Sequence, residues 1–246
     1  MKKRLLSLAA FVLSLNGYAA NDAAWMRYCA ISPDGQQIAF SYKGDIYTVG
    51  VNGGRANQIT TNPAHDTRPI WSPNGQQIAF ASDRLGGMDI YIVDKEGGVP
   101  TRITTHSGNE TPLAFKDNEH ILFQANILPA ADDMQFASAQ FPQVYEVSTS
   151  GGRPIMFSSM PMEDISISAD GKTLLYHDKK GYEDNWRKHH TSSITRDVWM
   201  CNLDGERSYK KLSTFNGEDR TPVWANADTY YYLSEQNGSF NVFKAN

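Results

Sequence analysis

The chain has 246 residues and a formal net charge of −4, from 23 Lys and Arg against 27 Asp and Glu. This balance excludes a typical nucleic-acid binder, because neutralising phosphates requires a concentrated basic face. The two cysteines, Cys29 and Cys201, are too few for a fold held together by a disulfide framework. A single bridge between them stays open, since the sequence does not show whether they lie close enough to pair.

Residues 1–19 have the three parts of a secretory signal. Lys2, Lys3 and Arg4 precede an apolar run over 5–15, and small residues follow up to Ala19. The apolar run is shorter than the about 20 residues that cross a bilayer, and no later segment is long enough either. No cysteine follows the expected cleavage point directly. We therefore expect a signal peptide over 1–19 and an exported, periplasmic protein without a lipid anchor or membrane insertion.

A sequence repeat runs through the rest of the chain. Ile31–Phe40 (ISPDGQQIAF) recurs as Trp71–Phe80 (WSPNGQQIAF). Weaker copies occupy 113–123, 167–176 and 223–232. A second alternating segment follows each copy, as in Asp45–Val49 (DIYTV) and Asp89–Val93 (DIYIV), and the first four units then have a glycine turn and a short last strand.

Each repeat unit is expected to form antiparallel strands. In Ser-Pro-Asp-Gly, proline fixes φ, aspartate bonds the turn locally and glycine accepts positive φ, so the tetrapeptide indicates a β-turn. The flanking segments alternate and are rich in Ile, Val, Tyr and Phe, which favours strands. Four-stranded units of about 40 residues stack radially as propeller blades. A β-sandwich with coincidental repeats is the weaker alternative, because the turn and the strand after it recur in register.

The predicted fold is therefore all-β, a β-propeller of four-stranded antiparallel blades over 20–246. Four complete units and a partial fifth are expected, at 25–69, 70–112, 113–164, 165–222 and 223–246. Propellers close with typically about four to eight blades, so the partial fifth unit predicts an incomplete ring and a fragment of a longer protein. Recurrent aromatic residues are expected in the core: Phe40, Tyr47, Trp71, Phe80, Tyr91, Phe123, Tyr145, Trp199 and Trp224.

The blade pattern, with Trp-Ser-Pro-Asn-Gly at 71–75, Ile-Ala-Phe, Asp-Ile-Tyr and Gly-Gly, resembles the TolB-like propeller repeat. Gly181–Trp199 is similar to the amino-terminal propeller of exported tricorn-type serine peptidases. The resemblance covers essentially all of the expected mature chain. It implies that a peptide-binding module and a serine-peptidase domain follow in the complete protein, so that catalysis lies beyond Asn246.

The chain shows no catalytic or cofactor motif of its own. It has no Gly-x-Ser-x-Gly elbow, no His-Glu-x-x-His pair and no glycine-rich phosphate loop. His189 and His190 are the only adjacent histidines, and in an extended segment neighbouring side chains point to opposite faces. We therefore predict no catalytic residue, no cofactor and no metal site.

Strand parity predicts which loops share a face of the propeller. The Ser-Pro-Asp-Gly and Gly-Gly turns should lie on one face, and the loops between second and third strands should share the other with the crossings between blades. Both long insertions, 126–142 and 178–196, lie on that second face. Loops on a rigid scaffold commonly bind ligands, so the candidate binding residues at the channel mouth and in the insertion are Asp66, Arg68, Glu110, Glu163, Asp164, Trp186, Arg187, His189, His190, Asp219 and Arg220. Solvated or mutually paired turn residues are the alternative interpretation of the same pattern.

The functional hypothesis is a non-catalytic propeller segment that guides or gates peptide substrate and braces a catalytic domain outside this chain. The expected partners are a peptide or protein substrate and the further domains of the parent protein, with neither nucleic acid nor membrane among them; self-association of the full-length protein stays open. One alternative is a TolB-like periplasmic interaction scaffold without enzymatic activity. Another is the propeller half of a prolyl-oligopeptidase-type hydrolase.

Overall fold

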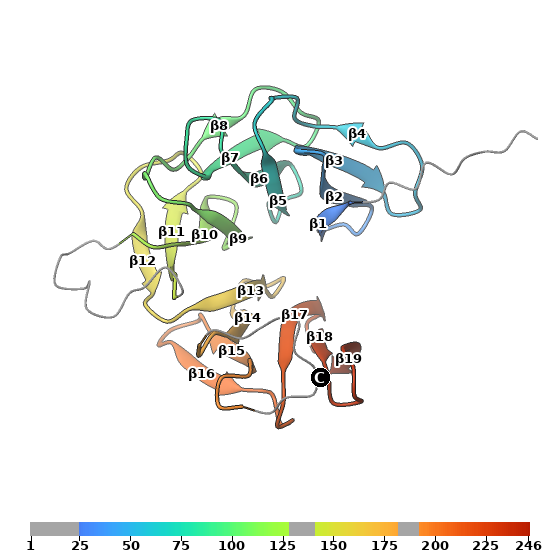
Figure 1. Cartoon of the computed structure of the whole chain (residues 1–246), viewed down its shortest axis with the longest axis vertical. Coiled ribbons are helices and arrows are strands. Elements are labelled where there is room, and N and C mark those ends of the chain that lie inside the picture. The colour runs from blue at the N-terminus through green and yellow to red at the C-terminus, as the bar shows by residue number, and fades with distance from the viewer. Residues whose placement is uncertain (1–24, 128–140, 182–191) are drawn as a thin grey trace, which may run out of the picture.

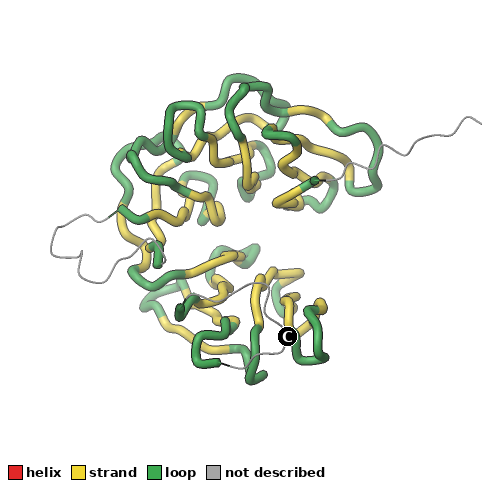
Figure 2. The backbone as a smooth tube through the Cα atoms, in the orientation of Figure 1, coloured by secondary structure: helices red, strands yellow, loops and turns green. Residues whose placement is uncertain are grey.

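The computed structural model describes residues 25–127, 141–181 and 192–246. These ranges form five β-sheets of antiparallel strands, and no helix occurs in them (Figure 2). Within each sheet the strands neighbour one another in sequence order, so each sheet is a meander. We call the sheets blades A to E in chain order.

Four blades have four strands and the last has three. Blade A contains β1 (Arg27–Ile31), β2 (Gln37–Tyr42), β3 (Asp45–Gly50) and β4 (Asn57–Gln58). Blade B contains β5 (Asp66–Trp71), β6 (Gln77–Ser82), β7 (Asp89–Asp94) and β8 (Thr101–Arg102). Blade C contains β9 (Thr111–Phe115), β10 (His120–Ala125), β11 (Gln143–Ser148) and β12 (Ile155–Ser158). Blade D contains β13 (Met162–Ile167), β14 (Thr173–Asp178), β15 (Val198–Asn202) and β16 (Ser208–Lys211). Blade E contains β17 (Asp219–Asn226), β18 (Thr229–Ser234) and β19 (Asn241–Ala245).

The blades follow one another in an arc around a common axis, with the first strand of each blade nearest the axis (Figure 1). Consecutive first strands are in contact, from β1 against β5 to β13 against β17. The arc is open between blade A and blade E (Figure 1). The structure confirms the predicted β-propeller with an incomplete ring. In blades B to E the first strands start before the predicted unit boundaries, because crossing residues such as those at 66–69 belong to the strand that they lead into.

The Ser-Pro-Asp-Gly segments form the predicted turns. In blade A, Ser32 Oγ donates to Asp34 Oδ1 at 2.5 Å and accepts the Gln37 N–H at 2.9 Å, while the Gly35 N–H donates to the Ser32 carbonyl at 2.8 Å. Gly35 has φ +68°, the left-handed conformation for which glycine is suited. Blades B and D repeat these bonds with Ser72 and Ser168. The turn chemistry therefore fixes the first hairpin of each of these blades.

Apolar residues pack between successive blades. One cluster joins blade B to blade C through Ile90, Phe123 and Tyr145, and another joins blade A to blade B through Ile46, Trp71 and Phe80. Two further clusters continue through blades C, D and E. The predicted core aromatic residues are buried or partly buried. Burying each contributes on the order of 1.5 to 3 kcal/mol, so the sheets are held together face to face.

Backbone hydrogen bonds show that the crossings share a face with the loops between second and third strands. The Asp66 N–H donates to the Gly44 carbonyl at 2.7 Å, and the Glu110 N–H donates to the Met88 carbonyl at 2.7 Å. The Asp219 N–H makes the same kind of bond to Arg196 at 3.0 Å. The structure thereby confirms the parity argument, and we call this side the crossing face.

Cys29 is exposed, Cys201 is buried and both are free thiols. In the described ranges, no helix is long and apolar enough to cross a membrane.

Candidate functional site

The first strands bulge toward the axis at equivalent positions in four blades. Tyr28, Arg68, Asp164 and Thr221 have φ values of 54°, 54°, 49° and 53°. Strand pairing skips at each of them, which is a β-bulge. A left-handed conformation is uncommon outside glycine, so its repetition marks a built feature of the inner surface. In blade C, Leu113 lies beside a simpler irregularity.

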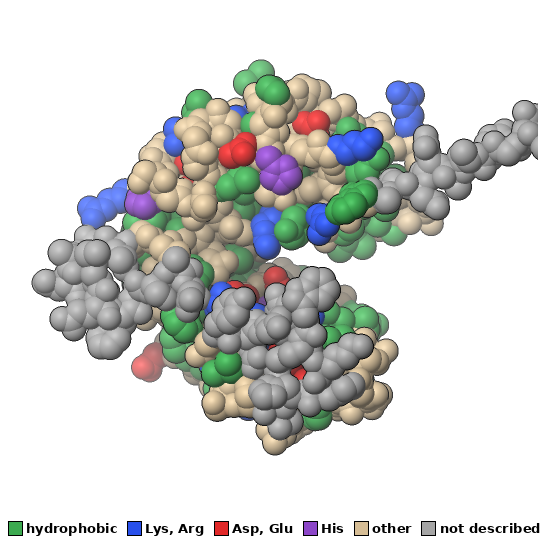
Figure 3. Space-filling model, viewed as in Figure 1, with side chains coloured by type: hydrophobic (Ala, Val, Ile, Leu, Met, Phe, Trp, Pro, Cys, Tyr) green, Lys and Arg blue, Asp and Glu red, His purple; other side chains and the backbone are tan. Residues whose placement is uncertain are grey.

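Four of these residues, Arg68, Leu113, Asp164 and Thr221, line a cavity of about 300 Å³ near the axis. Its wall is formed by Arg68, Leu113, Gln124, Glu163, Asp164, His177, Arg196, Arg220, Thr221 and Leu233. They come from blades B to E and from the segment before β15, so no single blade makes the site. On the face seen in Figure 3, Lys and Arg side chains gather along the hollow in the middle of the molecule. The cavity is therefore polar, with cationic and anionic groups on its wall.

Four of the predicted binding residues lie in this wall: Arg68, Glu163, Asp164 and Arg220. Three others, Asp66, Glu110 and Asp219, are buried inside the blades and do not lie in this wall. Asp66 accepts two hydrogen bonds from Arg84 Nη2, at 2.9 and 2.8 Å, and Glu110 accepts one from Thr104 Oγ1 at 2.7 Å. Asp219 is also buried. Each stands at or next to the start of a first strand, where its side chain turns inward to bond the previous blade or its own hairpin.

The predicted insertion residues Trp186, Arg187, His189 and His190 lie outside the described residues. Among the described residues, no group of three or more His, Cys, Asp or Glu side chains could hold a metal ion.

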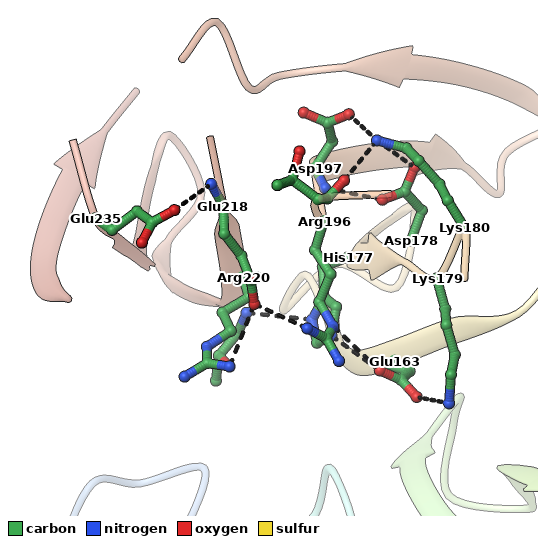
Figure 4. A network of polar contacts seen from close by, with 12 residues as sticks. Glu163, His177, Asp178, Lys179, Lys180, Arg196, Asp197, Glu218, Arg220 and Glu235 are labelled. Atoms are coloured by element: carbon green, nitrogen blue, oxygen red, sulfur yellow. Dashed lines mark hydrogen bonds and ion pairs between the residues drawn. The ribbon is translucent and has the colours of Figure 1, made fainter. Parts of the chain in front are cut away.

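Glu163 is the centre of an ionic network in the cavity wall (Figure 4). His177 Nε2 lies 3.2 Å from Glu163 Oε2, Lys179 Nζ lies 3.1 Å from Oε1, and Arg196 Nε lies 3.6 Å from Oε2. Burial opposes ionisation of Glu163, but its hydrogen bonds and electrostatic interactions with His177 and Lys179 outweigh burial and lower its pKa to about 2. Glu163 is therefore ionised near neutral pH, and its contacts tie together the strands of blade D.

The network continues into the crossing that precedes blade E. Arg196 Nη1 lies 2.8 Å from Glu218 Oε1, and Arg220 Nη1 lies 3.2 Å from the same oxygen. The Arg220 guanidinium also stacks over the Phe240 ring at 4.1 Å. The Glu218 carboxylate thus orients two arginine side chains. Both arginines line the cavity.

A second cluster lies beside this network, also in blade D (Figure 4). Lys180 Nζ is paired with Asp197, and it lies 3.5 Å from Asp178 Oδ2. Lys211 Nζ lies 2.8 Å from Asp197 Oδ2. Asp178 Oδ2 also accepts the Trp199 indole N–H at 3.1 Å. These charges compensate one another, so the cluster ties Lys180 and Lys211 to Asp197 at the start of β15.

Arg68 and Asp164 are the least committed charged groups of the wall. The Arg68 guanidinium stacks over the Tyr28 ring at 4.4 Å and has no ion pair within the described parts of the chain. Asp164 Oδ2 accepts the Thr221 hydroxyl at 2.8 Å, and the Asp164 side chain is 44% exposed. Both side chains can bond a ligand without breaking a buried ion pair. Chemically, Arg68 offers a hydrogen-bond donor and Asp164 an acceptor in the same cavity wall.

Sequence reasoning missed His177, Arg196, Gln124 and Thr221 as cavity residues. His177 and Gln124 sit in second strands, where their place facing the axis follows from strand register. The available signal was the position of these residues in the repeat. The fifth residue of the second strand is Ser41 in blade A, Ala81 in blade B, Gln124 in blade C and His177 in blade D. A polar residue at that position of the repeat therefore indicates the inner surface.

The repeated turns, the four-stranded blades and the polar axial cavity define a propeller domain of the TolB-like type. The chain belongs to the tricorn protease N-terminal beta propeller domain family, whose model matches residues 23–246. It is 22% identical over 214 residues to tricorn protease homolog 1 of Streptomyces coelicolor, covering 87% of this chain and 19% of that protein. It is 24% identical over 218 residues to a tricorn protease homolog of Saccharolobus solfataricus, covering 85% and 19%. The chain thus spans about a fifth of the length of these relatives.

Solved structures share the fold. A crystal structure of the tricorn protease matches with a TM-score of 0.69 and 20% identity, over 90% of this chain and 21% of that one. A TolB structure from Agrobacterium tumefaciens matches with a TM-score of 0.57 and 21% identity, over 91% and 76%.

Proposed function

We propose that this chain is the non-catalytic propeller segment of an exported tricorn-type serine peptidase, and that its axial cavity guides or gates peptide on the way to a catalytic domain elsewhere in the full protein. The observation that carries the proposal is the cavity wall itself. It combines a cation, Arg68, that is stacked on Tyr28 with a partly exposed anion, Asp164, at equivalent inward bulges of two blades.

An extended peptide fits this chemistry. Its backbone alternates carbonyl acceptors with N–H donors, which Arg68 and Asp164 can bond. Leu113 and Leu233 add apolar surface to the same wall, against which side chains can pack. The volume of about 300 Å³ suits a short segment of a chain and is too small for a folded domain.

The ends of the arc support a role in bracing other domains. On blade E, Val223, Tyr231 and Val242 are exposed, and on the blade A side Met26 and Ile31 are exposed. Apolar groups on these two faces would be covered by further parts of the protein or by another copy. Export to the periplasm, with cleavage of residues 1–19, belongs to the same proposal and is supported by the basic, apolar and small segments at 2–19.

Peptide binding to the chain tests this function. Fluorescein-labelled hexapeptides of mixed sequence are titrated with the protein, and anisotropy is measured for wild type, Arg68→Ala and Asp164→Asn. Losing one charge-assisted hydrogen bond should raise the Kd about tenfold in each variant. Arg153→Ala is the matched control, because Arg153 is exposed in the β11–β12 turn on the opposite face.

Absence of saturable binding, or an equal loss in the Arg153→Ala control, would contradict peptide guidance by this cavity. In that case a TolB-like interaction scaffold without enzymatic activity becomes the better account, and folded partner proteins would be the ligands to test.

A further inference from the structure

The same inter-blade hydrogen bond occurs twice near the axis with different acceptors. The N–H of Arg68 in blade B donates to Ser41 Oγ in blade A at 3.2 Å. The N–H of Thr221 in blade E donates to His177 Nδ1 in blade D at 3.2 Å. We call each of these bonds a latch, because it joins the left-handed residue of one blade to the second strand of the blade before it.

Strand register shows that the two latches are equivalent. Ser41 pairs with Arg27, the residue before the left-handed Tyr28. His177 pairs with Glu163, the residue before the left-handed Asp164. The donors match as well, since Arg68 and Thr221 have φ values of 54° and 53°. The repeat has therefore placed a hydroxyl in one latch and an imidazole in the other.

The latch geometry defines the tautomer of His177. Because Nδ1 accepts the Thr221 N–H, it carries no proton, and the imidazole proton lies on Nε2. That nitrogen lies 3.2 Å from Glu163 Oε2 and donates to it. The side chain of His177 is 4% exposed, so the ring is held between its two partners.

The charges around His177 favour a second arrangement once the ring is protonated. Glu163 and Asp164 on β13 face it, with Asp164 Oδ2 lying 3.8 Å from Nδ1. Lys179 and Arg196 contact Glu163, and Arg68 and Arg220 line the same cavity from β5 and β17. A protonated imidazole has two donors and no acceptor. Its Nδ1–H cannot bond the Thr221 N–H and would turn toward Asp164.

We propose that His177 makes the latch between blades D and E sensitive to pH, whereas the Ser41 latch between blades A and B is not. Imidazole is the side chain whose ordinary titration falls between about pH 5 and 8. Protonation breaks the bond to Thr221, strengthens the contact with Asp164 and loosens the junction beside the cavity. The mechanism does not depend on which ligand the cavity takes.

Amide hydrogen exchange of the full chain, measured by NMR at pH 7.5 and pH 5.0 and corrected for intrinsic exchange, tests the proposal. The protection factor of the Thr221 amide should fall about tenfold at the lower pH, the effect of losing one hydrogen bond. The Arg68 amide, held by Ser41, is the control inside the same molecule and should keep its protection.

His177→Asn supplies the matched variant, since the asparagine Oδ1 takes the place of Nδ1 and does not titrate. The Thr221 amide of H177N should have the same protection at both pH values. Equal pH responses of the Thr221 and Arg68 amides in wild type, or an unchanged pH response of Thr221 in H177N, would overturn the proposal. A nitrogen-15 spectrum of the wild-type imidazole gives an independent check, because a proton on Nδ1 at pH 7.5 would also overturn it.

Discussion

The central blades and the end blades of this propeller are built from the same repeat but are buried very differently. In blades B and C, five consecutive residues are buried in each third strand, β7 and β11. In blade A, four of the five residues of β1 are exposed, and in blade E the edge strand β19 has no buried residue. The difference arises because a central blade packs on a neighbour at each face, whereas an end blade packs on one.

This comparison indicates where the stability of the molecule resides. Contacts between neighbouring blades supply most of the apolar burial, so the central blades contribute most to the free energy of unfolding. Each end blade leaves apolar side chains exposed on its outer face. The polar cavity lies near the axis and draws on blades B to E, so its shape depends on the central blades as well as on the last one.

The largest expected effect comes from removing a central core side chain. Phe123 on β10 is 0% exposed, and Phe123→Ala should lower the free energy of unfolding by about 3–5 kcal/mol because it leaves a cavity. Val242→Ala on β19 is the matched control, since Val242 is 69% exposed and its loss should stay within about 0.5 kcal/mol. Urea unfolding measures both. Similar losses in the two variants would show that burial does not separate the central blades from the ends.

A second contrast concerns buried and exposed ion pairs. Asp66, with a fully buried side chain, pairs with Arg84 at 2.8 Å, whereas Lys172 and Asp204 pair at 3.2 Å with both side chains more than half exposed. Asp66→Asn should cost about 3 kcal/mol, because it leaves the Arg84 charge without its partner. Asp204→Asn should cost no more than about 0.5 kcal/mol. Urea unfolding of both variants checks the contrast, which fails if Asp66→Asn is as mild as Asp204→Asn.

The smallest effect depends on pH. Burial, with the negative charge of Asp89 acting in the same direction, raises the pKa of Glu110 from an ordinary 4.5 to about 7. The folded state therefore holds this proton where the unfolded state has lost it, so the contribution to stability is greatest below pH 4.5 and is lost as pH rises toward 7. Between pH 5 and pH 8, the free energy of unfolding of the wild type should fall by about 2 kcal/mol more than that of Glu110→Gln.

Glu119→Gln is the control for this prediction, because Glu119 is exposed in the β9–β10 turn. Urea unfolding at pH 5, 6, 7 and 8 gives the comparison. If Glu110→Gln and Glu119→Gln showed the same pH dependence, Glu110 would not be the group that titrates.

The fold could be predicted from sequence because its signals are local. Proline and glycine mark the Ser-Pro-Asp-Gly turns, alternation marks the strands on each side, and repetition in register identifies the blades. The sharing of one face by crossings and loops also followed, since it depends only on strand parity. Each of these features is set by residues that lie close together in the chain.

The site was predicted only in part because its decisive features are not local. Asp66 and Arg68 stand two residues apart in one crossing, yet one is buried against Arg84 and the other faces the cavity. A β-bulge lies between them and puts Arg68 in a left-handed conformation, as equivalent bulges do for Asp164 and Thr221. None of these residue types predicts that conformation from sequence. His177 enters the site through its register with β13, and in the sequence only its position in the repeat signals this.

The most direct test of the central claim, that the axial cavity is a peptide site, is a crystal structure of the chain with a bound hexapeptide. We predict an extended peptide in the cavity, with its backbone bonded to Arg68 and Asp164. A peptide bound elsewhere on the protein, or a cavity left empty at saturating peptide, would contradict the account.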